Sequence, residues 1–180
     1  MEKSDEEKVL ECRNGNDDYF RELVEKYASP VFNVCARLAG RENASDLTQD
    51  TFLKAWKHLK KFNPKKACFK TWLFAIARNT ATDYLRRKKI PSFSDLGTDE
   101  EPFADLPDEE LLPDEALAKI EDKKLLEQVL EKLPENYKAI LVLYYQEEMT
   151  FKEIGEVMKM PLNTVKSSHR RALISLRKML

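Results

Sequence analysis

One stretch of this sequence, residues 90–115, divides the chain into two parts that must fold separately. Four of the eight prolines lie in it: Pro91, Pro102, Pro107 and Pro113. The same stretch holds ten Asp and Glu residues and no Lys or Arg. Prolines at this density interrupt helices, and so acidic a segment has little apolar surface to bury. We therefore expect an extended acidic linker between two small domains, residues 1–89 and 116–180.

Both flanking parts show helical periodicity and no alternation typical of strands. In the first part, one set of apolar residues recurs at helical spacing and predicts a core stripe: Phe20, Leu23, Val24, Tyr27, Val31, Val34, Cys35 and Leu38. The helices expected in the first part lie near residues 5–14, 17–39, 44–60 and 69–88. Those expected in the second lie near 115–132, 135–147, 150–158 and 162–178. The predicted fold class is all-α.

Local signals predict where the first helices begin and end. Ser4, Asn16 and Asn43 are N-cap candidates, because their short side chains can accept hydrogen bonds from free backbone amides. Gly15 and Gly40 are candidates for helix ends.

Hydropathy and cysteine content point to a cytoplasmic protein. The longest apolar run, AILVLYY at 139–145, is far shorter than the ~20 residues of a membrane span. The acidic start MEKSDEEK is unlike a signal peptide. Cys12, Cys35 and Cys68 form no CxxC pair and are too few for a disulfide framework, so we expect buried, reduced, structural thiols.

The net charge of −1 conceals strong segregation of charge along the chain. Residues 60–89 hold ten basic residues and a single acid, Asp83. Residues 159–180 hold six basic residues and no acid. Basic surfaces on both sides of an acidic linker indicate that both domains bind an anionic partner.

The C-terminal stretch TFKEIGEVMKMPLNTVKSSHRRALISLRKML predicts a helix-turn-helix. Gly155 lies where the two helices would approach each other most closely. The outward residues of the second helix are donors or cations without a carboxylate: Asn163, Thr164, Lys166, Ser167, Ser168, Arg170 and Arg171. These side chains suit base edges and phosphates in a major groove. A helical hairpin with a solvated face would show the same pattern.

The helix expected over 69–88 combines aromatic bulk with a basic end. Its Asn79 and Asp83 can hydrogen-bond base edges, and Arg86 and Arg87 can hold phosphates. The segment KKFNPKKACFK, residues 60–70, is basic and carries one ring near each end, Phe62 and Phe69. It could accept a flipped-out base. Aromatic residues at helical spacing are more often core, and the basic segment fits a solvated connection equally well.

A third surface lies on the helix expected over 44–60. Asp46, Gln49, Asp50 and Leu53 fall at i, i+3, i+4 and i+7, which forms one acidic and amide strip beside an apolar side. Either solubility or a partner protein with a basic helix would explain the strip.

Nothing in the sequence favours an enzyme. The two histidines, His58 and His169, lie in separate domains, and neither has an obvious Cys or Ser partner for nucleophilic catalysis. Their spacing also supplies no metal site. We expect no catalytic residues, metal, cofactor or small-molecule substrate. A stand-alone helix-turn-helix regulator that dimerises on a palindrome remains an alternative.

Four stretches together resemble a known family. They are DLTQDTFLKAW, FKTWLFAIARNTATDYLRR, LEKLPENYKAILVLYYQEEMTFKEIGEVM and NTVKSSHRRA. In this order they resemble the bacterial RNA polymerase sigma factors of the extracytoplasmic-function (ECF) group, within the sigma-70 family. The resemblance covers nearly the whole chain and implies sigma region 2 in residues 1–89 and region 4 in residues 116–180.

The resemblance implies a transcription initiation factor that brings core RNA polymerase to promoters and aids strand separation. It assigns polymerase binding, on the beta-prime coiled coil, to Asp46, Gln49, Asp50, Leu53 and Trp56. It assigns the minus-ten element to Phe62, Phe69, Lys70, Phe74, Asn79, Asp83, Arg86 and Arg87. It assigns the minus-thirty-five element to the outward residues of the second helix given above. Further implied partners are the beta flap of the polymerase and an anti-sigma factor, which in this family is often membrane-bound.

The chain departs from the family pattern in its helix-turn-helix. Lys159 replaces a frequent turn glycine, and Asn163 stands where glycine is usual. Ser168 and His169 stand where Arg and Leu are common. Fewer cations on the second helix imply weaker salt dependence of binding and an unusual minus-thirty-five sequence.

Overall fold

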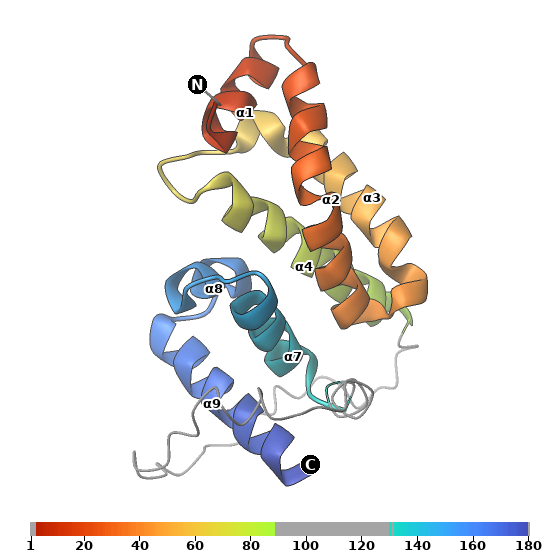
Figure 1. Cartoon of the computed structure of the whole chain (residues 1–180), viewed down its shortest axis with the longest axis vertical. Helices are drawn as coiled ribbons and strands as arrows, with labels where there is room; N and C mark the ends of the chain where they lie inside the picture. The colour runs from red at the N-terminus through yellow and green to blue at the C-terminus, as the bar shows by residue number, and fades with distance from the viewer. Residues whose placement is uncertain (1–2, 89–129, 131, 180) are drawn as a thin grey trace.

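The computed structural model describes residues 3–88, 130 and 132–179, and every regular element within them is a helix (Figure 1). The first group comprises α1 (Asp5–Arg13), α2 (Asp18–Ala39), α3 (Arg41–His58), the 3-10 turn η1 (Leu59–Lys61) and α4 (Phe69–Lys88). The second comprises α7 (Glu135–Leu141), the π-helical η2 (Val142–Gln146), α8 (Phe151–Met158) and α9 (Leu162–Met179). The prediction of an all-α chain with two helical domains is confirmed. The linker at 90–115 and nearly all of the helix expected near 115–132 lie outside the described residues.

The first domain is built around α2, which packs against α1, α3 and α4. Six residues of the expected apolar stripe are buried: Leu23, Tyr27, Val31, Val34, Cys35 and Leu38. The other two, Phe20 and Val24, are half-buried. From α3, Leu47, Phe52 and Ala55 face this stripe. Burial of this apolar surface is the main contribution that holds the four helices together.

Two of the three predicted N-caps are wrong. Ser4 does cap α1, since its Oγ accepts from the Glu7 amide at 3.2 Å and the Glu7 carboxylate accepts from the Ser4 amide at 2.7 Å. However, α2 begins after Asp17 rather than Asn16, and α3 begins directly after Gly40. Gly40 has φ +88°, so one residue completes the chain reversal and α3 starts earlier than the cap pattern indicates. Asn43 instead donates to the Ala39 carbonyl at 2.7 Å.

The short helix α1 fastens both ends of the basic loop at 60–70. The Arg13 guanidinium donates to the Leu59 carbonyl at 2.8 Å and also to the Phe62 carbonyl. The Glu6 carboxylate accepts from the Phe69 amide at 2.9 Å, in the first turn of α4. A carboxylate at this position also complements the positive end of the helix dipole. The loop therefore has anchored ends and an exposed middle.

The second domain contains the expected helix-turn-helix in α8 and α9. Thr150 and Glu153 form a capping box that starts α8. Ile154 and Met158 of α8 and Val165, Ala172 and Leu176 of α9 are buried. A Cβ at Gly155 would lie 2.9 Å from the Met160 carbonyl oxygen and 3.8 Å from Val165, so the turn needs a residue without a side chain here.

The two domains pack against each other through α4 (Figure 1). This helix contacts α2 and α3 of its own domain and α8 of the second, and α2 also contacts α7. One continuous cluster of buried residues runs from Leu73 and Phe74 to Met149 and Ile154. Part of α4 is therefore covered by the second domain.

The cysteines differ from the sequence-based expectation in one case. Cys12 and Cys35 are buried thiols, and burial raises the pKa of Cys35 to about 11. Cys68 is exposed, with its Sγ 3.2 Å from the Thr71 hydroxyl, because it lies outside the core just before α4 begins. Within the described residues, no helix is both long and apolar enough to cross a bilayer. The same residues contain no group of three or more His, Cys, Asp or Glu arranged to hold a metal ion.

Candidate functional site

The acidic strip of α3 is presented on the surface. Its four residues and the neighbouring Trp56, which is counted with the strip from here on, are all exposed: Asp46, Gln49, Asp50, Leu53 and Trp56. They share one side of α3 because the opposite side, with Ala44, Leu47, Thr51 and Ala55, is buried against the domain. Leu53 and Trp56 are unusually open for their size, at 56% and 40% exposed. Charge and apolar surface thus lie together on one helix face.

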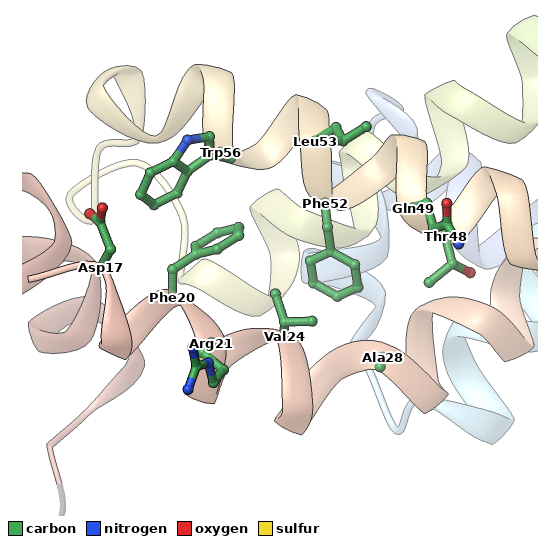
Figure 2. A pocket seen from close by; sticks show the side chains of 10 residues that line it. All are labelled: Asp17, Phe20, Arg21, Val24, Ala28, Thr48, Gln49, Phe52, Leu53 and Trp56. Carbon is green, nitrogen blue, oxygen red and sulfur yellow. The ribbon is translucent and has the colours of Figure 1, made fainter.

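An apolar groove of about 680 Å³ lies beside this strip, between α2 and α3 (Figure 2). Its wall on the α3 side includes Gln49, Leu53 and Trp56 of the strip. On the α2 side, Phe20 faces Trp56, and the two ring centroids are 4.8 Å apart with a tilt of 55°. The remaining lining residues are Asp17, Arg21, Val24, Ala28, Thr48 and Phe52.

The groove adds α2 residues that sequence reasoning missed. Phe20 and Val24 lie on the apolar stripe of α2 and are only half-buried. The signal available in the sequence was the extension of the stripe past Leu23 toward the start of the helix. A ligand for this surface would need an apolar anchor for the groove and cations for Asp46 and Asp50.

The second candidate surface, around the basic loop and α4, differs most from expectation. Phe62, Phe69 and Phe74 are 4%, 0% and 0% exposed, so none presents a ring to a base in this conformation. Phe62 and Phe69 pack with Trp72, with centroid separations of 5.3 Å and 5.7 Å. These packed rings lie on the buried side of the basic loop at 60–70, and Asn63, Lys65 and Lys66 of the loop are exposed.

Phe74 and Lys70 lie on the side of α4 that faces the second domain. Lys70 Nζ is 5.9 Å from the centroid of the Phe74 ring and donates to the Glu147 carbonyl at 2.5 Å. The Lys70 ammonium also helps to lower the pKa of Glu153, whose main cause is the hydrogen bond from Thr150. A lysine predicted to contact DNA is thus engaged within the protein here.

The remaining minus-ten candidates lie along the exposed half of α4. Asn79 and Asp83 are half-buried, one turn apart, and Arg86 and Arg87 are exposed near the end of the helix. The Asn79 side-chain oxygen accepts from Arg78 at 3.1 Å, and Asp83 pairs with Arg86 at 3.1 Å. The structure therefore brings together four of the eight residues on one accessible stretch.

On α9, the exposed residues gather at the first turns. Asn163, Thr164 and Lys166 are exposed, and the Ser167 hydroxyl donates to the Thr164 carbonyl at 3.0 Å. Arg170 and Arg171 are half-buried. These six residues leave the start of α9 polar and positively charged, as expected for a helix that enters a major groove.

Two neighbouring residues face inward instead. Ser168 is only 7% exposed, so in this conformation it cannot make the DNA contact that the sequence predicts. It falls three residues after the buried Val165, on the same helix face. His169 packs in an aromatic cluster, with its ring 4.8 Å from Tyr144 and 5.1 Å from Phe151. The start of α9 therefore has fewer outward polar groups than its sequence indicates.

Comparison with protein-family models gives two matches. Residues 23–90 match the family described as Sigma-70 region 2, and residues 129–178 match that described as Sigma-70, region 4. Together the two matches cover well over half of the chain.

Curated relatives match over nearly the full length. The ECF RNA polymerase sigma factor SigW of Bacillus subtilis is 30% identical, over 100% of this chain and 98% of the relative. The RNA polymerase sigma-H factor of Pseudomonas aeruginosa is 31% identical, over 95% of this chain and 91% of the relative.

Two solved structures share the fold. CnrH, in complex with the cytosolic domain of CnrY, superposes with a TM-score of 0.71 at 21% identity, covering 98% of this chain and 97% of the other. The sigma factor RpoE of Bartonella quintana, in complex with the anti-sigma factor NepR, has a TM-score of 0.67 at 21% identity, covering 91% and 96%.

Proposed function

The chain belongs to the ECF group of the sigma-70 family of RNA polymerase sigma factors, and we propose that it holds core polymerase on α3 and promoter DNA on α4 and α9. As a transcription initiation factor it directs the polymerase to promoters. The observation that supports this division of labour best is the exposure of all five α3 strip residues beside an apolar groove.

The proposed polymerase contact combines two kinds of interaction. Asp46 and Asp50 provide negative charge for a basic helix, here the beta-prime coiled coil. Leu53, Trp56 and Phe20 provide apolar surface that lines the groove, and its burial by a partner is favourable. Buried aromatic anchors with a charged rim are the arrangement that concentrates binding energy in protein interfaces. We assign the contact with the beta flap to the second domain.

The proposed promoter contacts lie on two helices. On α4, Asn79, Asp83, Arg86 and Arg87 face outward and suit the separated strands of the minus-ten element. Lys70 and Phe74 would join them after a rearrangement that separates α8 from α4. Phe62 and Phe69 would join them only if their packing with Trp72 also opens. On α9, the exposed first turns suit the minus-thirty-five element.

The domain boundaries follow the same division. We place sigma region 2 in residues 1–89, the acidic linker in 90–115 and region 4 in 116–180. The factor itself supplies recognition and strand separation and carries out no bond chemistry, which belongs to the polymerase. It therefore requires no cofactor or small-molecule substrate.

An anti-sigma protein is the proposed regulator. The α3 strip and its groove form a surface that an inhibitor must cover to keep polymerase away. A partner with cationic and apolar side chains would bind there by the same chemistry as the polymerase, so that the two would exclude each other. The regulator and polymerase would then compete for the factor.

Charge reversal tests the proposed polymerase contact. The double variant Asp46→Lys, Asp50→Lys is expected to weaken binding to core RNA polymerase by more than about thirtyfold, which corresponds to roughly 2 kcal/mol. Its circular dichroism should match that of the wild type, because both positions are exposed.

A matched control separates local from overall charge. Glu25→Lys, Glu156→Lys makes the same net charge change at two exposed positions outside the groove lining. This control should compete normally for core polymerase. Equal competition by the wild type and the Asp46→Lys, Asp50→Lys variant would refute the assignment of α3.

A further inference from the structure

Leu162 is an exposed apolar residue at the start of α9. It is 44% exposed, whereas the buried residues Val165, Ala172 and Leu176 continue the same helix face. By periodicity Leu162 would be the first core residue of this stripe. Its exposure indicates that the stripe extends beyond the supporting helices at this end.

The surroundings of Leu162 match a surface that faces DNA. Asn163, Thr164 and Lys166 are exposed next to it, and no acidic residue occurs from Lys159 to the end of the chain. Helical side chains tilt toward the N-terminus. Leu162 therefore projects from the end of α9 that a helix-turn-helix inserts into the major groove.

The major groove offers a leucine one specific partner. Among base edges there, thymine alone carries a methyl group, at C5, and the polar groups are hydrogen-bond donors or acceptors. A leucine side chain against a cytosine edge would remove water from an amino group without replacing its hydrogen bond. Leucine at this position would therefore favour thymine over cytosine.

We propose that Leu162 reads the C5-methyl group of one thymine in the minus-thirty-five element. The inference rests on the proposed function of α9 and adds a specificity-determining residue to it.

Replacement of single thymines by deoxyuridine tests the proposal, since it deletes the methyl group and preserves pairing. The DNA is the strongest promoter recovered by transcription with core polymerase and the full chain, and the measured quantity is holoenzyme affinity. Loss of one methyl contact should weaken wild-type binding about fourfold at one thymine, from ~0.8 kcal/mol per buried methylene-sized group. Leu162→Ala should bind the thymine and uracil versions of that site equally.

Two further comparisons complete the test. Leu162→Met keeps an apolar side chain of similar size and should retain sensitivity to the methyl group. Cytosine at the same position should bind poorly, and 5-methylcytosine should recover part of the affinity in the wild type and none in Leu162→Ala.

The outcomes separate this inference from the proposed function. Specific promoter binding with the same uracil response in wild type and Leu162→Ala would overturn the role of Leu162 and leave the function intact. Absence of any promoter-specific binding by the holoenzyme would overturn both.

Discussion

The side chain of Lys70 in α4 donates a hydrogen bond to the main-chain carbonyl of Glu147, with 2.5 Å between Nζ and the oxygen. This bond joins the first domain to the second at the point where α8 covers α4. The Glu147 carboxyl group is itself buried, and burial raises its pKa, while the Lys70 charge acts in the opposite direction.

Glu147→Gln should stabilise the protein at neutral pH. A carboxyl group whose folded pKa is raised contributes stability below its unfolded pKa, near 4.5, and loses it as the pH rises through the folded value. Glutamine avoids the burial of charge. We expect a higher free energy of unfolding than wild type in urea at pH 7, with the gain shrinking toward pH 5. The exposed neighbour Glu148→Gln should change little, and an equal gain at both pH values would contradict the explanation.

Gly155→Ala should destabilise the helix-turn-helix by about 1–3 kcal/mol. The added Cβ would lie 2.9 Å from the Met160 carbonyl oxygen, which is backbone and cannot swing aside. Urea denaturation measures the loss. Glu156→Ala, at the next and exposed position, should lie within about 0.5 kcal/mol of wild type. A stable Gly155→Ala protein would show that the turn can relax.

Lys159→Gly should stabilise the same turn by roughly 0.5–1 kcal/mol. Lys159 ends α8 with φ 56° and ψ 42°, a left-handed conformation that is costly for residues with a Cβ. Lys159→Ala removes the same charge and keeps the Cβ, so it serves as the control and should bring no gain. A similar rise in both variants would indicate relief of charge repulsion instead of backbone strain.

Much of this fold can be predicted from sequence, and the exceptions have physical causes. Periodicity identifies α2, α8 and α9 because each buries one face. The helix predicted over 69–88 is likewise present as α4, but periodicity does not show which of its sides are buried. Leu73 and Phe74 are both buried, because α4 packs against its own domain and against α8. Contacts between distant segments leave no local signal, so the sequence could not show that Phe74 is covered.

The surface sites can likewise be predicted from the sequence only in part. The exposed strip on α3 follows from spacing alone, since one helix determines it. The groove beside it requires the position of α2 relative to α3, and Ser168 requires knowing which side of α9 packs inward. Both depend on tertiary packing.

Trp56→Ala should weaken binding to core polymerase by about thirtyfold or more, as expected for an aromatic anchor worth roughly 2 kcal/mol. Trp56 is 40% exposed and contacts Phe20, so its loss should affect folding much less than binding. Fluorescence anisotropy with labelled factor measures the affinity. Lys57→Ala, at the adjacent exposed position, should retain wild-type binding. Equal affinities for the two variants would exclude the groove from the interface.

Arg86→Ala, Arg87→Ala should reduce the salt dependence of promoter binding. Both side chains are exposed, and the ion pair of Arg86 with Asp83 lies at the surface, where it contributes little to stability. Each lost phosphate contact lowers the slope of log K against log salt by about 0.7–0.9. The double variant should therefore lower the slope of holoenzyme binding by about 1.4–1.8. Arg41→Ala, Lys57→Ala on α3 should leave it unchanged.

Transcription in vitro from a pool of genomic promoters, with purified core RNA polymerase and with or without this protein, tests the assignment as a whole most directly. We predict discrete start sites that appear only when the protein is present and disappear with Asp46→Lys, Asp50→Lys. Start sites identical with and without the wild-type protein, together with tight DNA binding by the protein alone, would contradict the assignment and indicate a stand-alone regulator.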